Sequence, residues 1–307
     1  MKKIAVIGSF GHDMIMQVSH IPARGETVGE GRFSETFGGK GANQALAAAK
    51  SGAEVVFVAM VGNDAVGDTA ISSFTEQGIN TDFMTQTDVI GTGTAMIFVG
   101  DDGENSITVA PGANYHLKEA EVDAAEKVLE TTSLILMQLE IPMETVEYVL
   151  HKAETWKVPV LFNPAPAKPL SDIALQRIHT LVVNETEAEI VSGETLEGAD
   201  SVTRIALSLR AKGPKVVIVT LGAEGAYVSS DEFTGLVPGN KVDVVDTTAA
   251  GDVFCGALST AICNNSSIEE AIKFANAAGA LAVTKLGAQP SVPAHVDIEE
   301  FIKNSTN

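Results

Sequence analysis

Cysteine is scarce in this sequence, which has two cysteines among 307 residues. Cys255 and Cys263 lie in one segment with a helical pattern, where they are poorly placed to bond to each other. A disulfide framework is therefore excluded, and a reducing compartment is the natural interpretation. Residues 1–8 lack the longer apolar run of a signal peptide, so we expect a cytoplasmic protein.

Basic residues are also few, because 20 Lys and Arg face 40 Asp and Glu, for a formal net charge of −20. A surface this acidic repels phosphate backbones and anionic lipid, so neither nucleic acid nor a membrane is expected as a partner. No apolar stretch approaches the roughly 20 residues of a membrane span. A site for an anion such as ATP would need a local positive field from helix N-termini, backbone amides, a lysine or metal ions.

Short apolar runs without polar interruption recur along the chain, as is typical of strands buried on both faces. They cover residues 4–7, 55–61, 134–137, 158–162, 181–183 and 216–219. Helical patterns cover residues 42–50, 66–77, 118–130, 145–156, 202–212, 250–263, 267–285 and 296–303. This alternation predicts an α/β fold with a mainly parallel sheet between two layers of helices.

Two segments, 14–37 and 92–109, break the alternation and predict a small β structure inserted as a lid. We expect this lid at the carboxyl edge of the main sheet, where open α/β sheets bind ligands. The core would then comprise residues 1–13, 38–91 and 110–307. Because no linker or repeat separates two halves, the lid is an insertion in one continuous core.

The run from Asp246 to Asp252, with sequence DTTAAGD, leads from a loop into a helix. Its small residues leave backbone N–H groups free to bind a phosphate, with the helix dipole behind them. Asp252, in the first helical turn, could accept a hydroxyl proton during phosphoryl transfer. The alternative is that Asp246 or Asp252 merely caps the helix.

Other polar turns are less specific. The glycine-rich run 38–41 around Lys40 suits a close ligand approach or a plain tight turn. Asp13 suits sugar hydroxyls or a turn, and Asn184 with Glu187 suits a magnesium–phosphate assembly or a helix cap. The turn 220–225 would admit a nucleotide or close a hairpin. Neither a P-loop nor the glycine fingerprint of a nicotinamide oxidoreductase is present.

Taken together, these motifs resemble those of the ribokinase family of carbohydrate kinases, the phosphofructokinase B superfamily. The resemblance covers essentially the whole chain and rests on six segments: 38–44, 137–140, 163–167, 184–189, 246–252 and 287–293. It implies a ribokinase-like three-layer α/β/α core with a small β-sheet lid. The implied activity is ATP-dependent phosphorylation of a small sugar, with D-ribose giving ribose 5-phosphate as the leading expectation.

The resemblance also implies residue roles. Asp252 would be the general base, and the amides of Ala249, Ala250 and Gly251 would form the anion hole. Expected sugar ligands are Asp13, Gly39, Lys40, Asn43, Glu140 and Asp252, and expected ATP ligands are Asn184, Thr220, Gly222, Gly225 and Asn276. Glu187 would order Mg²⁺ through water. Activating K⁺ would lie against Asp246 and Ser291 and the backbone oxygens of Thr248, Ala282, Lys285 and Gly287. The lid would form a homodimer interface.

One departure from the family concerns the sugar. The family commonly has asparagine at the position of Gly11, and His12 is bulkier than the small residue often found there. A kinase of another pentose, a deoxypentose or a nucleoside is therefore an alternative. A sugar-binding regulator without catalysis is a further alternative from another class, although the base and the anion-hole loop are all present.

Overall fold

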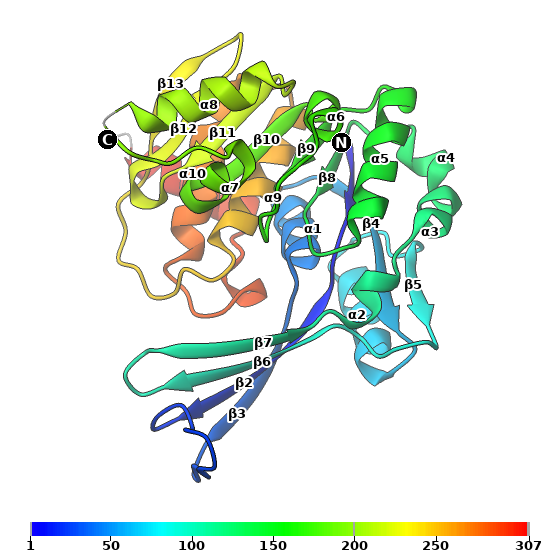
Figure 1. Cartoon of the computed structure of the whole chain (residues 1–307), viewed down its shortest axis with the longest axis vertical. Coiled ribbons are helices and arrows are strands. Elements are labelled where there is room, and N and C mark those ends of the chain that lie inside the picture. The colour runs from blue at the N-terminus through cyan, green and yellow to red at the C-terminus, as the bar shows by residue number, and fades with distance from the viewer. Residues whose placement is uncertain (1, 199, 306–307) are drawn as a thin grey trace.

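The computed structural model describes residues 2–198 and 200–305, and the expected core residues 1, 199, 306 and 307 lie outside them. A nine-stranded sheet forms the centre, in the order β13-β12-β11-β10-β9-β8-β1-β4-β5 (Figure 1). Its strands are β1 Lys3–Ile7, β4 Glu54–Gly62, β5 Met84–Thr87, β8 Leu134–Met137, β9 Val160–Phe162, β10 Thr180–Asn184, β11 Val216–Thr220, β12 Gly225–Ser229 and β13 Thr234–Pro238. The seven strands from β11 to β5 in this order pair in parallel. At the other end, β12 pairs antiparallel with both β11 and β13.

Helices cover both faces of the sheet, as the sequence predicts. They are α1 Lys40–Lys50, α2 Ala65–Glu76, α3 Glu119–Ala124, α4 Glu126–Leu129, α5 Met143–Trp156, α6 Asp172–Arg177, α7 Glu185–Ser192, α8 Ser201–Ala211, α9 Ala250–Cys263, α10 Ile268–Ala282 and α11 His295–Ser305. Alternate residues of β1 enter opposite cores: Ile4 and Val6 belong to the cluster that includes buried residues of α1, α9 and α10, whereas Ala5 and Ile7 belong to the cluster that includes those of α5 and α8. Burial on both faces explains the unbroken apolar runs.

A separate four-stranded sheet projects from one side of the core (Figure 1). We call it the lid sheet; its strands are β2 Gly11–Val18, β3 Arg32–Gly38, β6 Thr94–Gly100 and β7 Asn105–Ala110. Its first strand begins at Gly11 rather than at the expected residue 14, so Asp13 lies on the lid sheet. The α/β/α core with an additional small β sheet confirms the predicted fold class.

Some elements differ from the sequence-based expectation. The helix expected over 118–130 is two short helices that meet at Ala125, and the apolar pattern missed β5, β12 and β13. The turn after Thr220 is part of the β11–β12 hairpin, with the short 3₁₀ turn η2 Gly222–Glu224 inside it. Among the described residues, no helix is both long enough and apolar enough to cross a membrane.

Candidate active site

Asp252 lies in the first turn of α9 and is 5% exposed. Its two carboxylate oxygens have different donors, both from α1. Asn43 Nδ2 donates to Oδ2 over 3.0 Å, and Gln44 Nε2 donates to Oδ1 over 3.0 Å. A helix-capping carboxylate bonds to the backbone of its own first turn, so these long-range contacts favour the functional interpretation.

Lys40 begins α1 beside this carboxylate. The negative charge of Asp252 is the main reason that the pKa of Lys40 lies above its ordinary value, with Glu140 and Glu187 adding to the effect against desolvation. Glu140 Oε2 accepts hydrogen bonds from the Lys40 backbone N–H, at 2.9 Å, and from Ser9 Oγ, at 2.5 Å. Lys40 therefore stays protonated and offsets the charge of several acids.

The loop before α9 delivers backbone amides to the same place. Ala249 has a left-handed backbone with φ 61°, an arrangement that costs a non-glycine residue about 1 kcal/mol or more. The helix starts at the next residue, so the amides of its first turn have no helical partner. A cavity of about 200 Å³ adjoins this loop, and its lining includes Lys40, Thr220, Ala249, Ala250, Gly251 and Asp252. An anion in this cavity would meet a helix N-terminus and a lysine.

Glu187, in the first turn of α7, also lines this cavity. It forms a reciprocal capping box with Asn184 at the start of α7, so the predicted capping role is real. Desolvation raises the pKa of Glu187 despite the hydrogen bond from the Asn184 backbone. No group of three His, Cys, Asp or Glu residues in the described part of the chain is arranged to hold a metal ion. A single carboxylate at a cavity suits Mg²⁺ as a water-mediated partner, since this ion usually keeps several waters.

Asp246 ties the loop before α9 to a second segment. Its Oδ1 accepts from the N–H and hydroxyl of Thr248, and its Oδ2 accepts from the Gly287 N–H over 2.8 Å. Burial would raise the pKa of Asp246, but these hydrogen bonds outweigh it and hold the pKa below its ordinary value. The backbone of Asp246 also bonds to the Val283 carbonyl. Ser291 is fully buried and donates to Ala288 O. The segments expected to bind K⁺ are thus adjacent.

The expected ATP ligands divide into two groups. Asn184 and Thr220, at the ends of β10 and β11, line the cavity. Gly222, Gly225 and Asn276 do not line it and lie around the β11–β12 hairpin and α10. Asn276 Nδ2 donates to the carbonyls of Val237 and Pro238, which holds α10 against β13. The structure therefore gives Asn276 a packing role beside the expected nucleotide contact.

Asp13 lies on β2 of the lid sheet, near enough to Glu140 for the two charges to interact. Desolvation, followed by repulsion from Glu140, raises the pKa of Asp13 to about 6, against a smaller opposing effect of His12. None of the described residues donates a hydrogen bond to the Asp13 side chain, unlike Asp252. A half-buried carboxylate in this state suits the hydroxyl groups of a ligand.

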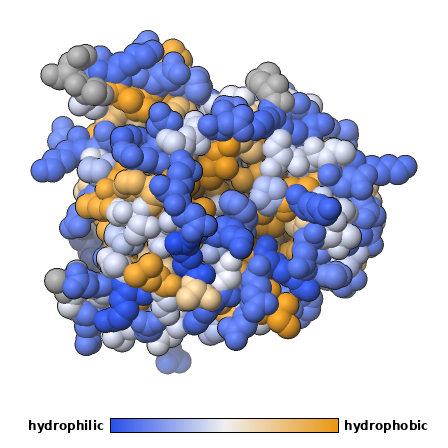
Figure 2. Space-filling view, turned by 90° about the horizontal axis from the view of Figure 1, so that it is seen from above, coloured by the Kyte–Doolittle hydropathy of each residue, from blue (hydrophilic) through white to orange (hydrophobic). Residues whose placement is uncertain are grey.

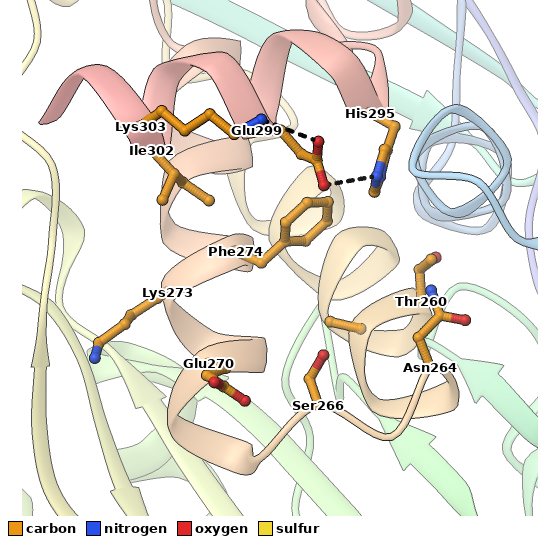
Figure 3. Close-up of a pocket in the computed structure, with 11 residues that line it drawn as sticks. Thr260, Asn264, Ser266, Glu270, Lys273, Phe274, His295, Glu299, Ile302 and Lys303 are labelled. Atoms are coloured by element: carbon orange, nitrogen blue, oxygen red, sulfur yellow. Dashed lines mark ion pairs between the residues drawn. The ribbon is translucent and has the colours of Figure 1, made fainter. Parts of the chain in front are cut away.

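A larger cavity, of about 400 Å³, lies away from these residues between α9, α10 and α11 (Figure 3). Phe274 and Ile302 line it, and Glu299 pairs there with His295 at 3.4 Å and Lys303 at 3.6 Å. None of the predicted site residues lines this cavity. Figure 2 views the core from the side away from the lid sheet and shows hydrophilic residues over much of that face, with smaller hydrophobic areas between them.

Sequence reasoning missed four buried polar residues of the site, namely Ser9, Gln44, Gln138 and Asn163. Gln44 contacts Asp252 directly, and Gln138 and Asn163 contact Gln44. The available signal was local: an amide at Gln44 interrupts an alanine-rich helix that is otherwise suited to tight apolar packing. Which partner such an amide faces depends on long-range packing, and no sequence pattern encodes it.

Comparison with known proteins adds independent evidence. A family model described as pfkB family carbohydrate kinase matches residues 1–295. A ribokinase from Haemophilus influenzae is 40% identical over 99% of both chains, and a deoxyribokinase from Salmonella typhimurium is 36% identical over 97% of this chain and 98% of its own. The crystal structure of a Thermotoga maritima ribokinase superposes with a TM-score of 0.91 at 36% identity, covering 99% of this chain and 100% of its own. A ribokinase from Arabidopsis thaliana complexed with ribose and ATP has a TM-score of 0.89 at 29% identity over 98% of this chain and 99% of its own.

Proposed function

The chain belongs to the pfkB family of carbohydrate kinases, and we propose that it is an ATP-dependent ribokinase that converts D-ribose to D-ribose 5-phosphate. The observation that carries the proposal is the position of Asp252. Its carboxylate, bound by Asn43, lines a cavity together with residues 249–251 at the start of α9 and with Lys40, whose charge also interacts with Glu140. The ribokinase and deoxyribokinase relatives support a pentose as the substrate.

In the proposed reaction, an oxygen of Asp252 accepts the proton of the primary sugar hydroxyl while the hydroxyl oxygen attacks the γ-phosphorus of ATP. The bond from that phosphorus to the bridging oxygen breaks, and ADP leaves. The amides of Ala249, Ala250 and Gly251 stabilise charge on the transferring group. Asp13, Gly39, Lys40, Asn43 and Glu140 hold the sugar, and Asn184, Thr220, Gly222, Gly225 and Asn276 surround the nucleotide.

Two metal ions belong to this proposal. Glu187 would hold a water ligand of Mg²⁺, and the ion, bound with ATP, would neutralise charge on the phosphate oxygens. K⁺ would lie against Asp246 and Ser291 and the backbone oxygens of Thr248, Ala282, Lys285 and Gly287. The hydrogen bonds from Thr248 and Gly287 to Asp246 support this, because they join the loop before α9 to the segment after α10. A cation there would fix the shape of the anion-hole loop without touching the sugar.

The sugar itself depends on the start of the lid sheet. A Cβ atom at Gly11 would lie 3.1 Å from the backbone nitrogen of Gly39, which is closer than ordinary contact. The asparagine that the family resemblance implies at this position would therefore need a small shift of Gly39. The absence of this side chain makes 2-deoxyribose the main alternative substrate, in line with the deoxyribokinase relative.

A coupled assay of ADP release tests the function. We expect D-ribose to give the highest kcat/KM among pentoses, 2-deoxyribose and nucleosides, with complete dependence on Mg²⁺ and a severalfold gain with K⁺. A higher kcat/KM for 2-deoxyribose would replace the sugar and leave the kinase assignment intact. Ribose binding by calorimetry without ADP release would instead identify a sugar-binding regulator.

We further infer a homodimer formed through the lid sheet. Side chains alternate between the faces of a strand, and both faces of this sheet carry large apolar groups. Ile15, Ile97 and Ile107 share the face of Asp13, whereas Met14, Met96 and Phe33 lie on the other. Phe33, Met96 and Ile107 are each more than half exposed. A surface of this kind, on a sheet that projects from the core, fits a second copy of the chain.

Charged substitutions in the lid sheet test the dimer. Met96→Glu and Ile107→Glu introduce a charge on opposite faces, and at least one of them is expected to convert the dimer to a monomer in analytical ultracentrifugation, because burying an unpaired charge is costly. Leu207→Glu, at a similarly exposed apolar position on α8, is the matched control and leaves the dimer intact. A monomeric wild-type protein at micromolar concentration would contradict the proposal.

A further inference from the structure

The residues around Asp252 include a buried chain of side-chain amides. Gln138 Nε2 donates to Gln44 Oε1 over 2.6 Å, and Gln44 Nε2 donates to Asp252 Oδ1 over 3.0 Å. Both glutamines are fully buried, and neither lines the cavity beside the anion-hole loop. Burying two polar side chains next to each other costs free energy unless every contact is satisfied, so this pair calls for a functional reason.

The chain of amides has only one consistent direction. An ionised carboxylate only accepts hydrogen bonds, so Gln44 must turn its NH₂ group toward Asp252. Its carbonyl oxygen then faces Gln138, which must present its own NH₂ group. Asn43, by contrast, donates to Asp252 while its Oδ1 has no partner among the described residues. The carboxylate therefore fixes both amides with their NH₂ groups toward it, but only Gln44 also has a partner for its oxygen.

A branch of this series of amides reaches Glu187, which also lines the cavity. Gln44 Nε2 also donates to Asn163 Oδ1 over 3.3 Å. Asn163 Nδ2 in turn donates to the Val182 carbonyl over 3.0 Å and, more weakly, to Glu187 Oε2 over 3.4 Å. Two buried amides, Gln44 and Asn163, thus connect the carboxylate in α9 with the carboxylate in α7.

Helix packing holds Gln44 in this place. Gly256 lies one turn after Asp252 on the same face of α9, and a Cβ atom there would lie 2.5 Å from Ala47 Cβ and 2.7 Å from the Gln44 carbonyl oxygen. The absence of that atom lets α9 lie directly on α1. The close approach brings the Gln44 side chain against the Asp252 carboxylate, so the contact is built into the core.

We propose that Gln44 is a positioning residue, which fixes the rotation of the Asp252 carboxylate and its alignment with Glu187. With Asn43 on one oxygen and Gln44 on the other, rotation of the carboxylate would break both hydrogen bonds at once. The remaining acceptor capacity is then aimed in one direction, as proton abstraction from a bound hydroxyl requires. This inference rests on the proposed kinase function and adds a residue that does not touch the substrate.

Three variants test the proposal in the ribokinase assay. Gln44→Met keeps the length of the side chain and removes the donor, and it is expected to lower kcat about 20-fold while the KM values for sugar and ATP stay within about twofold. Gln44→Glu has the same shape but faces Asp252 with a second acceptor, so kcat should fall about 100-fold or more. Gln138→Met removes the outer amide only. We expect kcat to fall about threefold, while the melting temperature falls by about as much as in Gln44→Met.

The pattern separates positioning from a merely structural role. If the activities of the three variants follow their melting temperatures, or if Gln44→Met retains kcat within twofold, the proposal is wrong. An inactive wild-type protein would refute the kinase function instead. In that case ¹⁵N spectra still decide the positioning: the Gln44 side-chain amide protons should exchange slowly with water in the wild type and rapidly in Asp252→Ala. Fast exchange in the wild type would overturn the proposed contact, and the same spectra serve if Gln44→Met fails to fold.

Discussion

Asp252→Asn is expected to lower kcat by about 10³-fold while the protein folds and still binds sugar. The variant removes the oxygen that would accept the hydroxyl proton, and general-base catalysis contributes about 10²–10⁴-fold. The new amide fits the site, because its carbonyl can accept from Gln44 and its NH₂ group can face a turned-over Asn43 amide. That rotation leaves the packing intact, since Asn43 Oδ1 has no partner to lose among the described residues.

Steady-state kinetics and sugar binding by calorimetry measure this effect. Asp172→Asn is the control, because Asp172 also lies in the first turn of a helix but is exposed, so it reports the loss of a helix-terminal charge alone. We expect this control to retain its activity. Asp252→Asn with more than a tenth of wild-type kcat would show that Asp252 is a helix-terminal acid rather than the base.

The parts of the site that follow strand ends were predictable from the sequence. Asn184 and Thr220 end two neighbouring parallel strands, so their meeting at one cavity follows from the sheet topology. Asp252 was predictable because a loop of small residues before an apolar helix is a local pattern. These predictions depend on chain direction and helix ends, which short sequence segments encode.

Contacts between helices far apart in the chain were not predictable. Gln44 meets Asp252 because α1 and α9 pack closely at Gly256, and no local pattern marks this glycine as a helix contact. The hairpin β12–β13 was missed because its residues are mixed in polarity and the antiparallel edge breaks the α/β alternation. Both misses concern tertiary packing, which overrides local propensity.

Positive groups at the site partly balance the negative charge of its acidic residues. Asp13, Glu140, Glu187 and Asp252 are carboxylates around a reaction whose second substrate is also an anion. Lys40 is the cation that acts on three of them, and its pKa is raised chiefly by Asp252. The remaining positive potential would come from backbone amides at the start of α9, which add no net charge. The four acids therefore stay close together at a cost in stability, and that cost can be measured at Asp13.

Asp13→Asn is expected to weaken sugar use and to stabilise the protein at the same time. The carboxylate that would accept from sugar hydroxyls is lost, and because hydrogen bonds to a charged group contribute about 1.5–3 kcal/mol each, kcat/KM for ribose should fall about 100-fold. The wild-type kcat/KM should also decline as the pH falls through the Asp13 pKa of about 6, since protonated Asp13 accepts poorly. The variant should lack this decline.

The stability effect has the opposite sign. Because the folded-state pKa of Asp13 is raised from 3.8 to about 6, the folded protein binds the proton more tightly than the unfolded chain does. The Asp13 contribution to the free energy of unfolding is therefore fully present below pH 3.8 and is lost as the pH rises through 6. A neutral asparagine avoids this loss, so Asp13→Asn should be more stable than the wild type at pH 7 by roughly 1–2 kcal/mol after allowance for solvent screening, and as stable as the wild type near pH 4.

Urea unfolding at the two pH values measures the difference, with the exposed Asp101→Asn as the control. A variant that is less stable than the wild type at pH 7 would show that the Asp13 carboxylate stabilises the lid sheet. The proposal that its burial costs stability for the sake of binding sugar hydroxyls would then be wrong.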